Sequence, residues 1–391
     1  MKDNKKNLMI LTDLKMGGVT TSAVNFCNGL CERGAQVDVL VMSDYPNGAE
    51  CAFSKKIRIL HLNGIFKLWN LDPEMVRRTK NILKKVWYLF LGMIKKIANK
   101  KKLWTKLLFR DKKLFKGYDV VIAYRQCQPC YYVALHNVEA KKKIAFVHGD
   151  LSFMGDVSTW LPLALDFDSV AYVSNAVKDG FVQKYPELKK NAITVYNTFL
   201  TKEILCQSRR PCDTSFDCGK INLITVSRIE NTMKGTGRIA PVCKLLKEKY
   251  PGKFHWYIVG DGPDLETCKA QSDALEVSDH LTYLGMRTNP FNLLSQADIC
   301  VFTTFTEAFP MIVGECLIVG TPIVTTRYPA VTEMIEDGKH GLIAEQSEAS
   351  IFEKLSKLFD NQKLLNDMKN NCLLYEYDND RSYRQFGEAV G

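Results

Sequence analysis

The chain has 391 residues, of which 46% are apolar and 25% are charged. These proportions are typical of folded globular proteins, and they exclude a disordered, collagen-like or integral-membrane chain. At about 150 residues per domain, the length predicts two to three domains. The longest apolar run, at positions 86–94, has nine residues, whereas a membrane-spanning helix needs about 20.

The net charge of +10 is concentrated in one segment. Between Arg77 and Lys116 there are 15 basic residues and a single acid, so the rest of the chain carries a net charge of −4. A nucleic-acid surface needs basic charge spread along the path of the phosphates. Because the charge here is confined to one place, we predict no nucleic-acid partner.

Short β-branched runs alternate with longer helical stretches along the chain. Several runs are continuously apolar, which is typical of parallel strands covered by helices on both faces. The predicted strands lie at residues 8–14, 37–42, 57–62, 119–124, 143–148, 169–174, 193–196, 222–227, 255–260, 281–285, 298–303, 322–325 and 341–344. This alternation predicts an α/β protein with doubly wound parallel sheets. The polar residues 201–220 interrupt it and are predicted to link two domains.

The first predicted strand runs into Gly17-Gly18, and a helix with apolar residues at helical spacing follows as far as Gly34. Two glycines at a strand-to-helix turn let a ligand approach the backbone closely and leave free N–H groups at the helix start. The G-x-G-x-x-G dinucleotide fingerprint is absent. A tight turn that binds nothing is the alternative interpretation.

The most informative stretch is FTTFTEAFPMIVGECLIVGTPIVT, residues 302–325. Glu307 falls in a loop after a strand, where open α/β sheets bind ligands. Pro310 is expected as the first helical residue, Glu315 lies about a turn and a half into the helix, and Gly320 ends it. The free backbone N–H groups around residues 309–312 would place anion-binding donors between two carboxylates, a combination suited to a sugar nucleotide. The alternative is a surface helix with two incidental acids.

The stretch EAFPMIVGECLIVGTPIVTT resembles the E-x7-E signature of retaining glycosyltransferases of family 4, which are two-domain GT-B enzymes that use nucleotide-sugar donors. Further matching pieces follow in order along nearly the whole chain: MGGVTTSAVNFCNGLCERGAQVDVL, KKIAFVHGD, YVSNAVKDGF, VSRIENTMKG, YIVGDGPD and TEMIEDGKHGLIAE. The similarity is greatest to bacterial enzymes that build capsule, exopolysaccharide or lipopolysaccharide. Ala308 and Cys316 depart mildly from the pattern, which has glycine and alanine there.

The resemblance implies a GT-B fold, in which two Rossmann-like doubly wound domains face a central cleft. Residues 1–200 plus 373–391 would form the acceptor-binding domain, residues 201–220 the linker, and residues 221–372 the domain that binds the nucleotide sugar. Domain closure would bring Gly17, Gly18 and His148 toward Glu307 and Lys234.

The resemblance also implies roles for individual residues. Arg228 and Lys234 would grip the donor diphosphate and stabilise the charge that grows on the leaving nucleotide. Glu315 would accept from the ribose hydroxyls, and Glu307 and His148 would face the transferred sugar. The further donor-binding residues would be Phe309, Pro310, Met311, Gly17 and Gly18. The reaction would proceed with retention and without a settled nucleophile, Glu307 being the nearest carboxylate if a covalent intermediate formed.

No metal or other cofactor is expected. Asp166-Phe167-Asp168 resembles the D-x-D motif of metal-dependent glycosyltransferases, but it precedes a strand instead of ending one. The 13 cysteines are an odd number scattered over a long chain, and no secretory signal is visible, so we expect reduced thiols in the cytoplasm. Cys127-x-x-Cys130 has no second pair to complete a zinc site, and we expect buried or idle thiols there.

Residues 76–116 are predicted to form a basic amphipathic segment. A helix over 76–108 would place a stripe of Lys and Arg opposite an apolar face, with Trp87 and Tyr88 nearby. Such a helix is typical of a membrane-surface element, which suits a lipid-linked acceptor. We therefore expect a cytoplasmic protein held at the inner face of the cell membrane. The alternative is a helix that packs on its own domain with solvated lysines.

The predicted function is transfer of a hexose or N-acetylhexosamine from a nucleotide sugar, UDP-linked rather than GDP-linked, to a lipid-linked or cell-envelope glycan. One alternative is a GT-B sugar-nucleotide epimerase or a phosphorylase. A second is a membrane-associated partner that binds the donor and transfers nothing. A third is a nucleic-acid binder acting through the basic segment, which would keep its affinity for DNA or RNA without Glu307.

Overall fold

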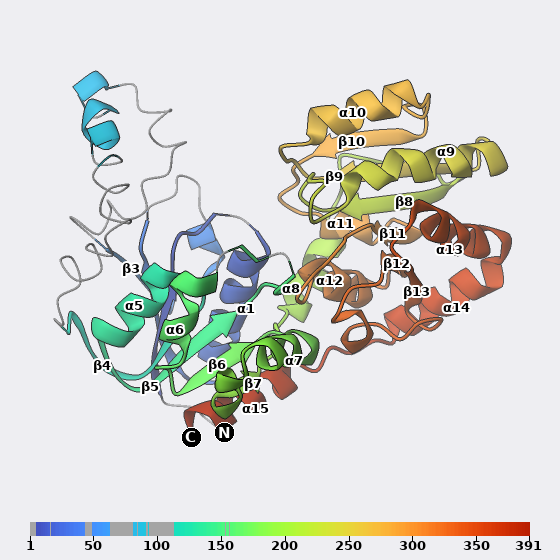
Figure 1. Ribbon diagram of the computed structural model, residues 1–391. Helices are drawn as coiled ribbons and strands as arrows, with labels where there is room; N and C mark the ends of the chain where they lie inside the picture. The colour runs from blue at the N-terminus through green and yellow to red at the C-terminus, as the bar shows by residue number, and fades with distance from the viewer. Residues whose placement is uncertain are drawn as a thin grey trace.

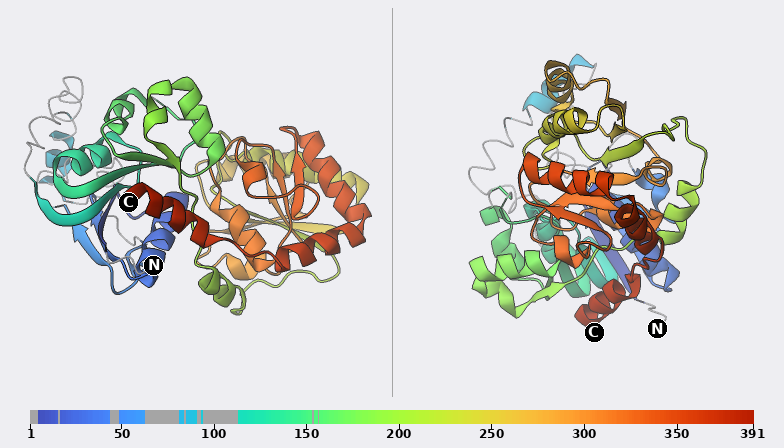
Figure 2. Two further views of the ribbon diagram at one scale, coloured as in Figure 1. Left: turned by 90° about the horizontal axis from the view of Figure 1, so that it is seen from below. Right: turned by 90° about the vertical axis from the view of Figure 1, so that its right-hand side faces the viewer.

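The computed structural model describes residues 5–15, 17–43, 49–62, 81–83, 85–90, 93, 113–152, 154–155 and 157–391. They form two α/β units, each built on one parallel sheet (Figure 1). Helices cover both faces of the sheets (Figure 2). This arrangement confirms the predicted pair of doubly wound, Rossmann-like units.

The N-terminal sheet has seven parallel strands in the order β3-β2-β1-β4-β5-β6-β7. They are β1 (Lys6–Leu11), β2 (Gln36–Val41), β3 (Arg58–His61), β4 (Phe115–Ala123), β5 (Val138–Val147), β6 (Ser169–Tyr172) and β7 (Ala192–Thr194). The described helices around this sheet are α1 (Gly18–Glu32), α5 (Gln128–His136), α6 (Leu161–Ala164), α7 (Asn175–Lys184) and α15 (Asn379–Val390).

The C-terminal sheet has six parallel strands in the order β10-β9-β8-β11-β12-β13. They are β8 (Ile221–Val226), β9 (Phe254–Val259), β10 (Leu281–Gly285), β11 (Ile299–Phe302), β12 (Ile323–Thr326) and β13 (Gly341–Ala344). The helices of this unit are α8 (Thr201–Ser208), α9 (Ile239–Lys249), α10 (Leu265–Ala274), α11 (Phe291–Leu294), α12 (Met311–Val319), α13 (Glu348–Asp360) and α14 (Gln362–Leu373).

The central strands of both sheets are buried along most of their length. β1, β2, β11 and β12 have buried residues at consecutive positions instead of every second one, because helices shield both faces of the sheet. One apolar cluster runs from the N-terminal sheet through Phe199 into helix α12, and a second fills the other face of the C-terminal sheet. The first cluster therefore holds the start of α12 against the N-terminal unit.

Helix α15 returns from the end of the chain to the N-terminal unit (Figure 2). The ring of Phe26 in α1 stacks on Tyr383, with centroids 5.5 Å apart, and meets Phe386 edge-on at 5.1 Å. Arg33 forms an ion pair with Asp380. This helix therefore ties the C-terminus to the first unit. The exact domain bounds given above remain a prediction.

The predicted linker at 201–220 includes a helix. It begins with α8, which packs against α11 and α12. Ile204 is the buried residue of this helix, so one apolar side chain among polar ones is enough to seat it. Tertiary packing stabilises this helix, which the polar local sequence does not indicate.

Several strand bounds also differ from the sequence prediction, among them the end of β1 and the start of β5. β1 ends at Leu11 instead of residue 14, because Asp13 turns the chain by accepting the amide of Lys15 at 3.0 Å. β5 starts at Val138, five residues before the predicted start. Its first half carries polar residues that are only partly buried, so their sequence lacks the apolar signal of a central strand.

Most of the basic segment 76–116 lies outside the described residues. Its described part includes helical residues at 82–83, 85–90 and 93, whose apolar side chains are open to solvent. Ile82 is 75% exposed, Leu83 79% and Trp87 57%. Among the described residues, no helix combines the length and the apolar character needed to cross a bilayer.

Candidate functional site

The candidate site lies at the carboxyl ends of β8 and β11. These strands are hydrogen-bonded neighbours at the centre of the C-terminal sheet, although they are far apart in the sequence. The sheet is built outward in opposite directions from this pair, and ligands of open α/β sheets bind at such a switch point. The loop after β8 carries Arg228 and Lys234, and the loop after β11 carries Glu307.

Hydrogen bonds to main-chain carbonyl groups hold these two loops together. The amide of Phe305 and the hydroxyl of Thr304 both donate to the carbonyl of Met233, each at 2.8 Å. The hydroxyl of Thr303 donates to the carbonyl of Gly235 at 3.0 Å. The relative position of the two loops is therefore set by backbone contacts and does not depend on the charged side chains.

Gly235 makes this close approach possible. Its φ is +59°, in the left-handed region that favours glycine. A Cβ atom at this position would lie 2.4 Å from the carbonyl oxygen of Thr303. Any other residue would push the two loops apart, and the side chain of the preceding Lys234 would move with its loop.

Lys234 and Glu307 form an ion pair between the two loops. Their side chains are only 25% and 13% exposed, so their attraction is less screened than that of a surface pair. An ammonium group has three donors and Glu307 uses one of them. Lys234 therefore keeps donors for an anion while remaining fixed in position by the carboxylate.

Helix α12 starts directly after the loop of Glu307. Pro310 is its cap residue, with extended backbone, and the first helical residue is Met311. This corrects the prediction that Pro310 itself starts the helix. Within the described chain, the amides of Phe309, Met311 and Ile312 have no hydrogen-bond acceptor. These amides and the positive end of the helix dipole can bind an anion. Gly320, with φ +87°, ends α12 as predicted.

Glu315 projects from α12 and is only 9% exposed. Burial raises the pKa of its carboxyl group to about 7. Its oxygen atoms accept no hydrogen bond from any described residue. A buried acid without donors is costly when ionised. Glu315 is therefore prepared to accept hydrogen bonds from a ligand that brings hydroxyl groups.

We predict that Glu315→Gln increases stability at alkaline pH. The pKa of this glutamate is near 4.5 when unfolded and about 7 when folded, so the folded state binds the extra proton between these values. The free energy of unfolding therefore falls as the pH rises through this window, by up to about 3 kcal/mol. Urea unfolding at pH 5 and pH 8 measures the loss, and the variant should not show it.

Glu353→Gln is the matched control, because this glutamate lies exposed on α13. Its pH dependence should equal that of the unmodified chain. An equal pH dependence for both variants would contradict the burial argument for Glu315.

His148 follows β5 at the carboxyl end of the N-terminal sheet. Its ring lies 4.5 Å from the ring of Tyr124 and 5.7 Å from that of Phe146, measured between centroids. Burial, with a contribution from the nearby charge of Arg125, lowers the pKa of His148 to about 3. Its Nε2 atom is buried and has no partner among the described residues. The imidazole is therefore neutral at physiological pH and can exchange a hydrogen bond, but it brings no charge.

A hydrogen bond joins the loops of the two units beside His148. The hydroxyl of Thr306 donates to Asp150 Oδ2 at 2.5 Å. Thr306 directly precedes Glu307, and Asp150 lies two residues after His148. The amide of Asn197 also donates to the carbonyl of Phe309 at 3.3 Å. The structure therefore brings His148, Glu307 and the start of α12 to one place between the sheets.

Three predicted residues are less closely joined to this group. Arg228 has a side chain that is 65% exposed, and its guanidinium lies 3.5 Å from Glu230. Among the described residues, Arg228 forms no hydrogen bond or ion pair with Lys234 or Glu307. Gly17 and Gly18 lie at the start of α1, and no atom of the described residues lies within 4 Å of where a Cβ atom would be. Their turn is open, and their presumed role in closure remains a prediction.

The sequence reasoning missed Glu333, which connects the two units. Glu333 lies in the short 3-10 turn Val331–Glu333. Its carboxylate accepts the amides of Asn175 at 2.9 Å and Ala176 at 2.8 Å, at the start of α7, and the hydroxyl of Tyr196 at 2.7 Å. Such charge-assisted bonds are stronger than neutral ones. The acid in TEMIEDG is a weak signal by itself, because its partners are about 140 to 160 residues away.

We predict that Glu333→Ala loosens the contact between the units. The change leaves two helix-start amides and a tyrosine hydroxyl without their acceptor, at a cost of about 2–4 kcal/mol in the free energy of unfolding. Glu336→Ala is the control, because its exposed carboxylate only pairs with Lys339 nearby in sequence. Urea unfolding measures both variants. Equal stability of the two would show that the Glu333 bonds contribute nothing.

Comparisons with known proteins agree with this geometry. Residues 213–373 match the family described as Glycosyl transferases group 1. The chain is 24% identical over 264 residues to N-acetyl-alpha-D-glucosaminyl L-malate synthase of Bacillus anthracis, covering 65% of this chain and 68% of that protein. It is 24% identical over 204 residues to lipopolysaccharide core biosynthesis glycosyltransferase LpsE of Rhizobium meliloti, covering 52% and 56%. The matched regions thus cover between about half and two thirds of the length of these two relatives.

The structure of Anabaena Alr3699/HepE in complex with UDP-glucose superposes with a TM-score of 0.70 at 16% identity, covering 99% of each chain. At this identity the likeness shows the fold, and it confirms the predicted GT-B arrangement. The part of the chain that matches the group 1 family, residues 213–373, contains both loops of the candidate site and helix α12.

Proposed function

We propose that this protein is a retaining glycosyltransferase of the family 4 type. It transfers a hexose or N-acetylhexosamine from a UDP-linked sugar to a lipid-linked or cell-envelope glycan acceptor. The observation that carries the proposal is the ion pair of Lys234 and Glu307 beside the free amides at the start of α12. The cation and the amides suit the phosphates of a sugar nucleotide, and the carboxylates suit its hydroxyl groups.

Lys234 and the amides of α12 bind the diphosphate in this proposal. Their charge and dipoles are already in place before the reaction, so they stabilise the negative charge that develops on the leaving nucleotide. Arg228 can join them from its exposed position on the loop after β8. These groups supply the positive charge, and the proposed reaction needs no metal.

The two glutamates have separate tasks. Glu315 accepts the ribose hydroxyls, which gives its buried carboxylate the donors it lacks in the protein alone. Glu307 and neutral His148 hold the hydroxyl groups of the transferred sugar. The bond between the anomeric carbon and the phosphate oxygen breaks, the acceptor oxygen bonds to the same face of that carbon, and the acceptor proton passes to the departing phosphate. Each carboxylate binds hydroxyl groups of the donor in this proposal. The pair therefore does not act as the general acid and base of a glycosidase.

The proposed acceptor reaches the site from a membrane. The exposed apolar side chains among the described residues 82–83, 85–90 and 93 include Trp87 and Phe90, which are 57% and 53% exposed, and lysines flank them in the sequence. Amphipathic segments of this kind bind the headgroup region of anionic bilayers. We therefore place the protein in the cytoplasm, at the inner face of the cell membrane.

Flotation with vesicles tests the membrane proposal. The protein should float with phosphatidylglycerol vesicles at low salt, float less at high salt, and stay behind with pure phosphatidylcholine. The double change Trp87→Ser, Phe90→Ser should reduce flotation severalfold. Absence of salt-sensitive flotation would remove the membrane from the proposal and leave glycosyl transfer untouched.

A panel of UDP- and GDP-sugars tests the transferase proposal. A UDP-sugar at about 100 times its dissociation constant should stabilise the protein by about 2.7 kcal/mol, and the bound sugar should be slowly released by hydrolysis with its anomeric configuration retained. Release of an epimer or of a sugar 1-phosphate would favour an epimerase or a phosphorylase. Binding without any turnover, even with lipid-linked acceptors, would favour a non-catalytic partner.

A further inference from the structure

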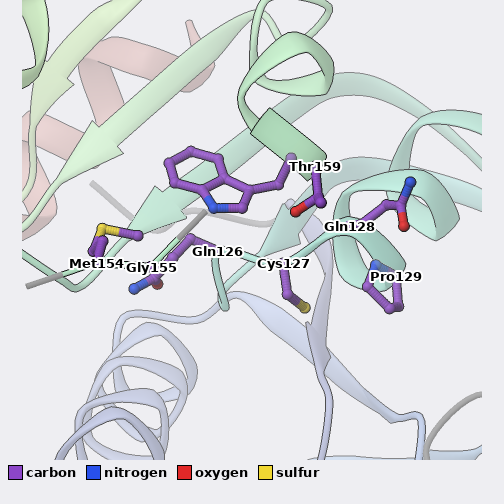
Figure 3. Close-up of a pocket in the computed structure, with 8 residues that line it drawn as sticks. Gln126, Cys127, Gln128, Pro129, Met154, Gly155 and Thr159 are labelled. Carbon is purple, nitrogen blue, oxygen red and sulfur yellow. The ribbon is translucent and has the colours of Figure 1, made fainter. Parts of the chain in front are cut away.

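A pocket of about 470 Å³ opens in the N-terminal unit at the carboxyl end of β4. Figure 3 shows its lining, which includes Gln126, Cys127 and Pro129 around the start of α5, and Met154 and Thr159 from the chain after β5. The pocket belongs to neither the ion pair of Lys234 nor helix α12. Its unusual feature is a cysteine pair, because Cys127 lines it and Cys130 lies one helical turn further on.

The two cysteines have different surroundings. Cys127 is the cap residue of α5 and is half-buried at the pocket wall. Cys130 is completely buried, with its sulfur 3.8 Å from that of Met42. A spacing of three residues at a helix start brings the two side chains to the same side of the first turn. Cys127 is therefore the member of the pair that lines the pocket, while Cys130 is covered and lies next to it.

Hydrogen bonds with Cys130 favour the thiolate of Cys127. The neighbouring thiol and amide of Cys130, together with the positive charge of Arg125, lower the pKa of Cys127, although burial and the negative charge of Asp13 oppose them. Burial and the adjacent Cys127 raise the pKa of Cys130 well above its ordinary value. Arg125 is fixed by Asp13 at 2.9 Å and by Thr12 at 2.6 Å. Its charge therefore stays near the pocket.

We propose that Cys127 and Cys130 form a reactive dithiol site that takes small disulfide compounds in this pocket and closes to an internal disulfide. The thiolate of Cys127 attacks one sulfur of the compound, forming a mixed disulfide and releasing one thiolate. Cys130 then loses its proton and attacks the sulfur of Cys127, releasing the second thiolate. Two protein thiols are oxidised and one disulfide compound is reduced to two thiols.

The site adjoins the sugar-transfer site through Gln126. The side-chain oxygen of Gln126 accepts the main-chain amide of His148 at 3.1 Å. Its side-chain nitrogen would lie 3.1 Å from a Cβ atom placed on Gly149. A disulfide would tie Cys127, the cap residue that directly follows Gln126, to the first turn of α5. The oxidation state of the dithiol can therefore affect the position of Gln126, and through it the loop that carries His148.

The order of alkylation tests the proposal on the unmodified protein. All 13 cysteines are free, and Cys206 on α8 is more exposed than Cys127. Limiting iodoacetamide at pH 7, followed by peptide mass spectrometry, should label Cys127 at least about tenfold faster than Cys206, because the thiolate is the reacting species. In denaturant this preference should vanish. Equal or slower labelling of Cys127 in the folded protein would overturn the proposal.

Oxidised glutathione tests the second step. Trypsin cleavage after Arg125 and Lys141 places both cysteines in one peptide. In the unmodified protein this peptide should lose two hydrogens and resist alkylation. Cys130→Ser should trap a glutathione adduct on Cys127, whereas Cys127→Ser should leave Cys130 unmodified and Cys206→Ser should behave as the unmodified protein. If neither the internal disulfide nor the trapped adduct is detected, the proposal is overturned. Both readouts are independent of glycosyl transfer.

Discussion

Lys234→Ala is expected to weaken the binding of UDP by about 10- to 100-fold. A charge-assisted hydrogen bond to phosphate contributes about 1.5–3 kcal/mol, and each 1.4 kcal/mol changes the affinity tenfold. The change also leaves Glu307 without its partner, so a free carboxylate then repels the diphosphate. Isothermal titration calorimetry with UDP measures the loss directly.

Lys244→Ala is the control for this experiment. Lys244 lies exposed on α9 in the same unit, and its change to alanine removes the same charge from the chain. Its affinity for UDP should remain within about twofold of the unmodified protein, since exposed distant charges are screened. Equal affinities of the two variants would mean that Lys234 does not touch the diphosphate.

Glu307→Gln is expected to reduce turnover by about 10²- to 10³-fold while the affinity for UDP changes much less. UDP lacks the transferred sugar, and Glu307 is proposed to face that sugar. Loss of one preorganised group at a reacting centre costs about 3–4 kcal/mol in the barrier. Glutamine keeps the shape of the side chain but no longer forms the ion pair with Lys234. Hydrolysis of the UDP-sugar measures turnover, and calorimetry with UDP measures affinity.

The outcome separates two roles for Glu307. If it only positions Lys234, Glu307→Gln should weaken UDP binding as strongly as Lys234→Ala does and leave the turnover of the bound donor nearly unchanged. Glu336→Gln, an exposed change in the same unit, should alter neither quantity.

The fold was largely predictable from the sequence, because continuous apolar runs and turn glycines are local signals. The strands at the centre of both sheets and the end of α12 at Gly320 follow from such signals. The start of α12 was displaced by one residue, since proline fits both the cap and the first helical position. Helix α8 was missed because its residues are polar and its seat is tertiary.

The candidate site was predictable to a smaller extent. Motif spacing pointed to Lys234 and Glu307, and only the hydrogen-bonded pairing of β8 with β11 places them in contact. The role of Glu333 could not be predicted, because its hydrogen-bond partners lie at the start of α7 in the other unit. Cys127 and Cys130 appeared idle in the sequence. Their importance comes from the pocket and from Arg125, which sequence spacing does not reveal.

A crystal structure of the protein with UDP tests the central claim most directly. The account predicts both phosphates at the start of α12, with an oxygen within hydrogen-bond distance of Lys234 Nζ and the ribose hydroxyls on the carboxylate of Glu315. A nucleotide bound elsewhere, with Lys234 and Glu315 untouched, would contradict it.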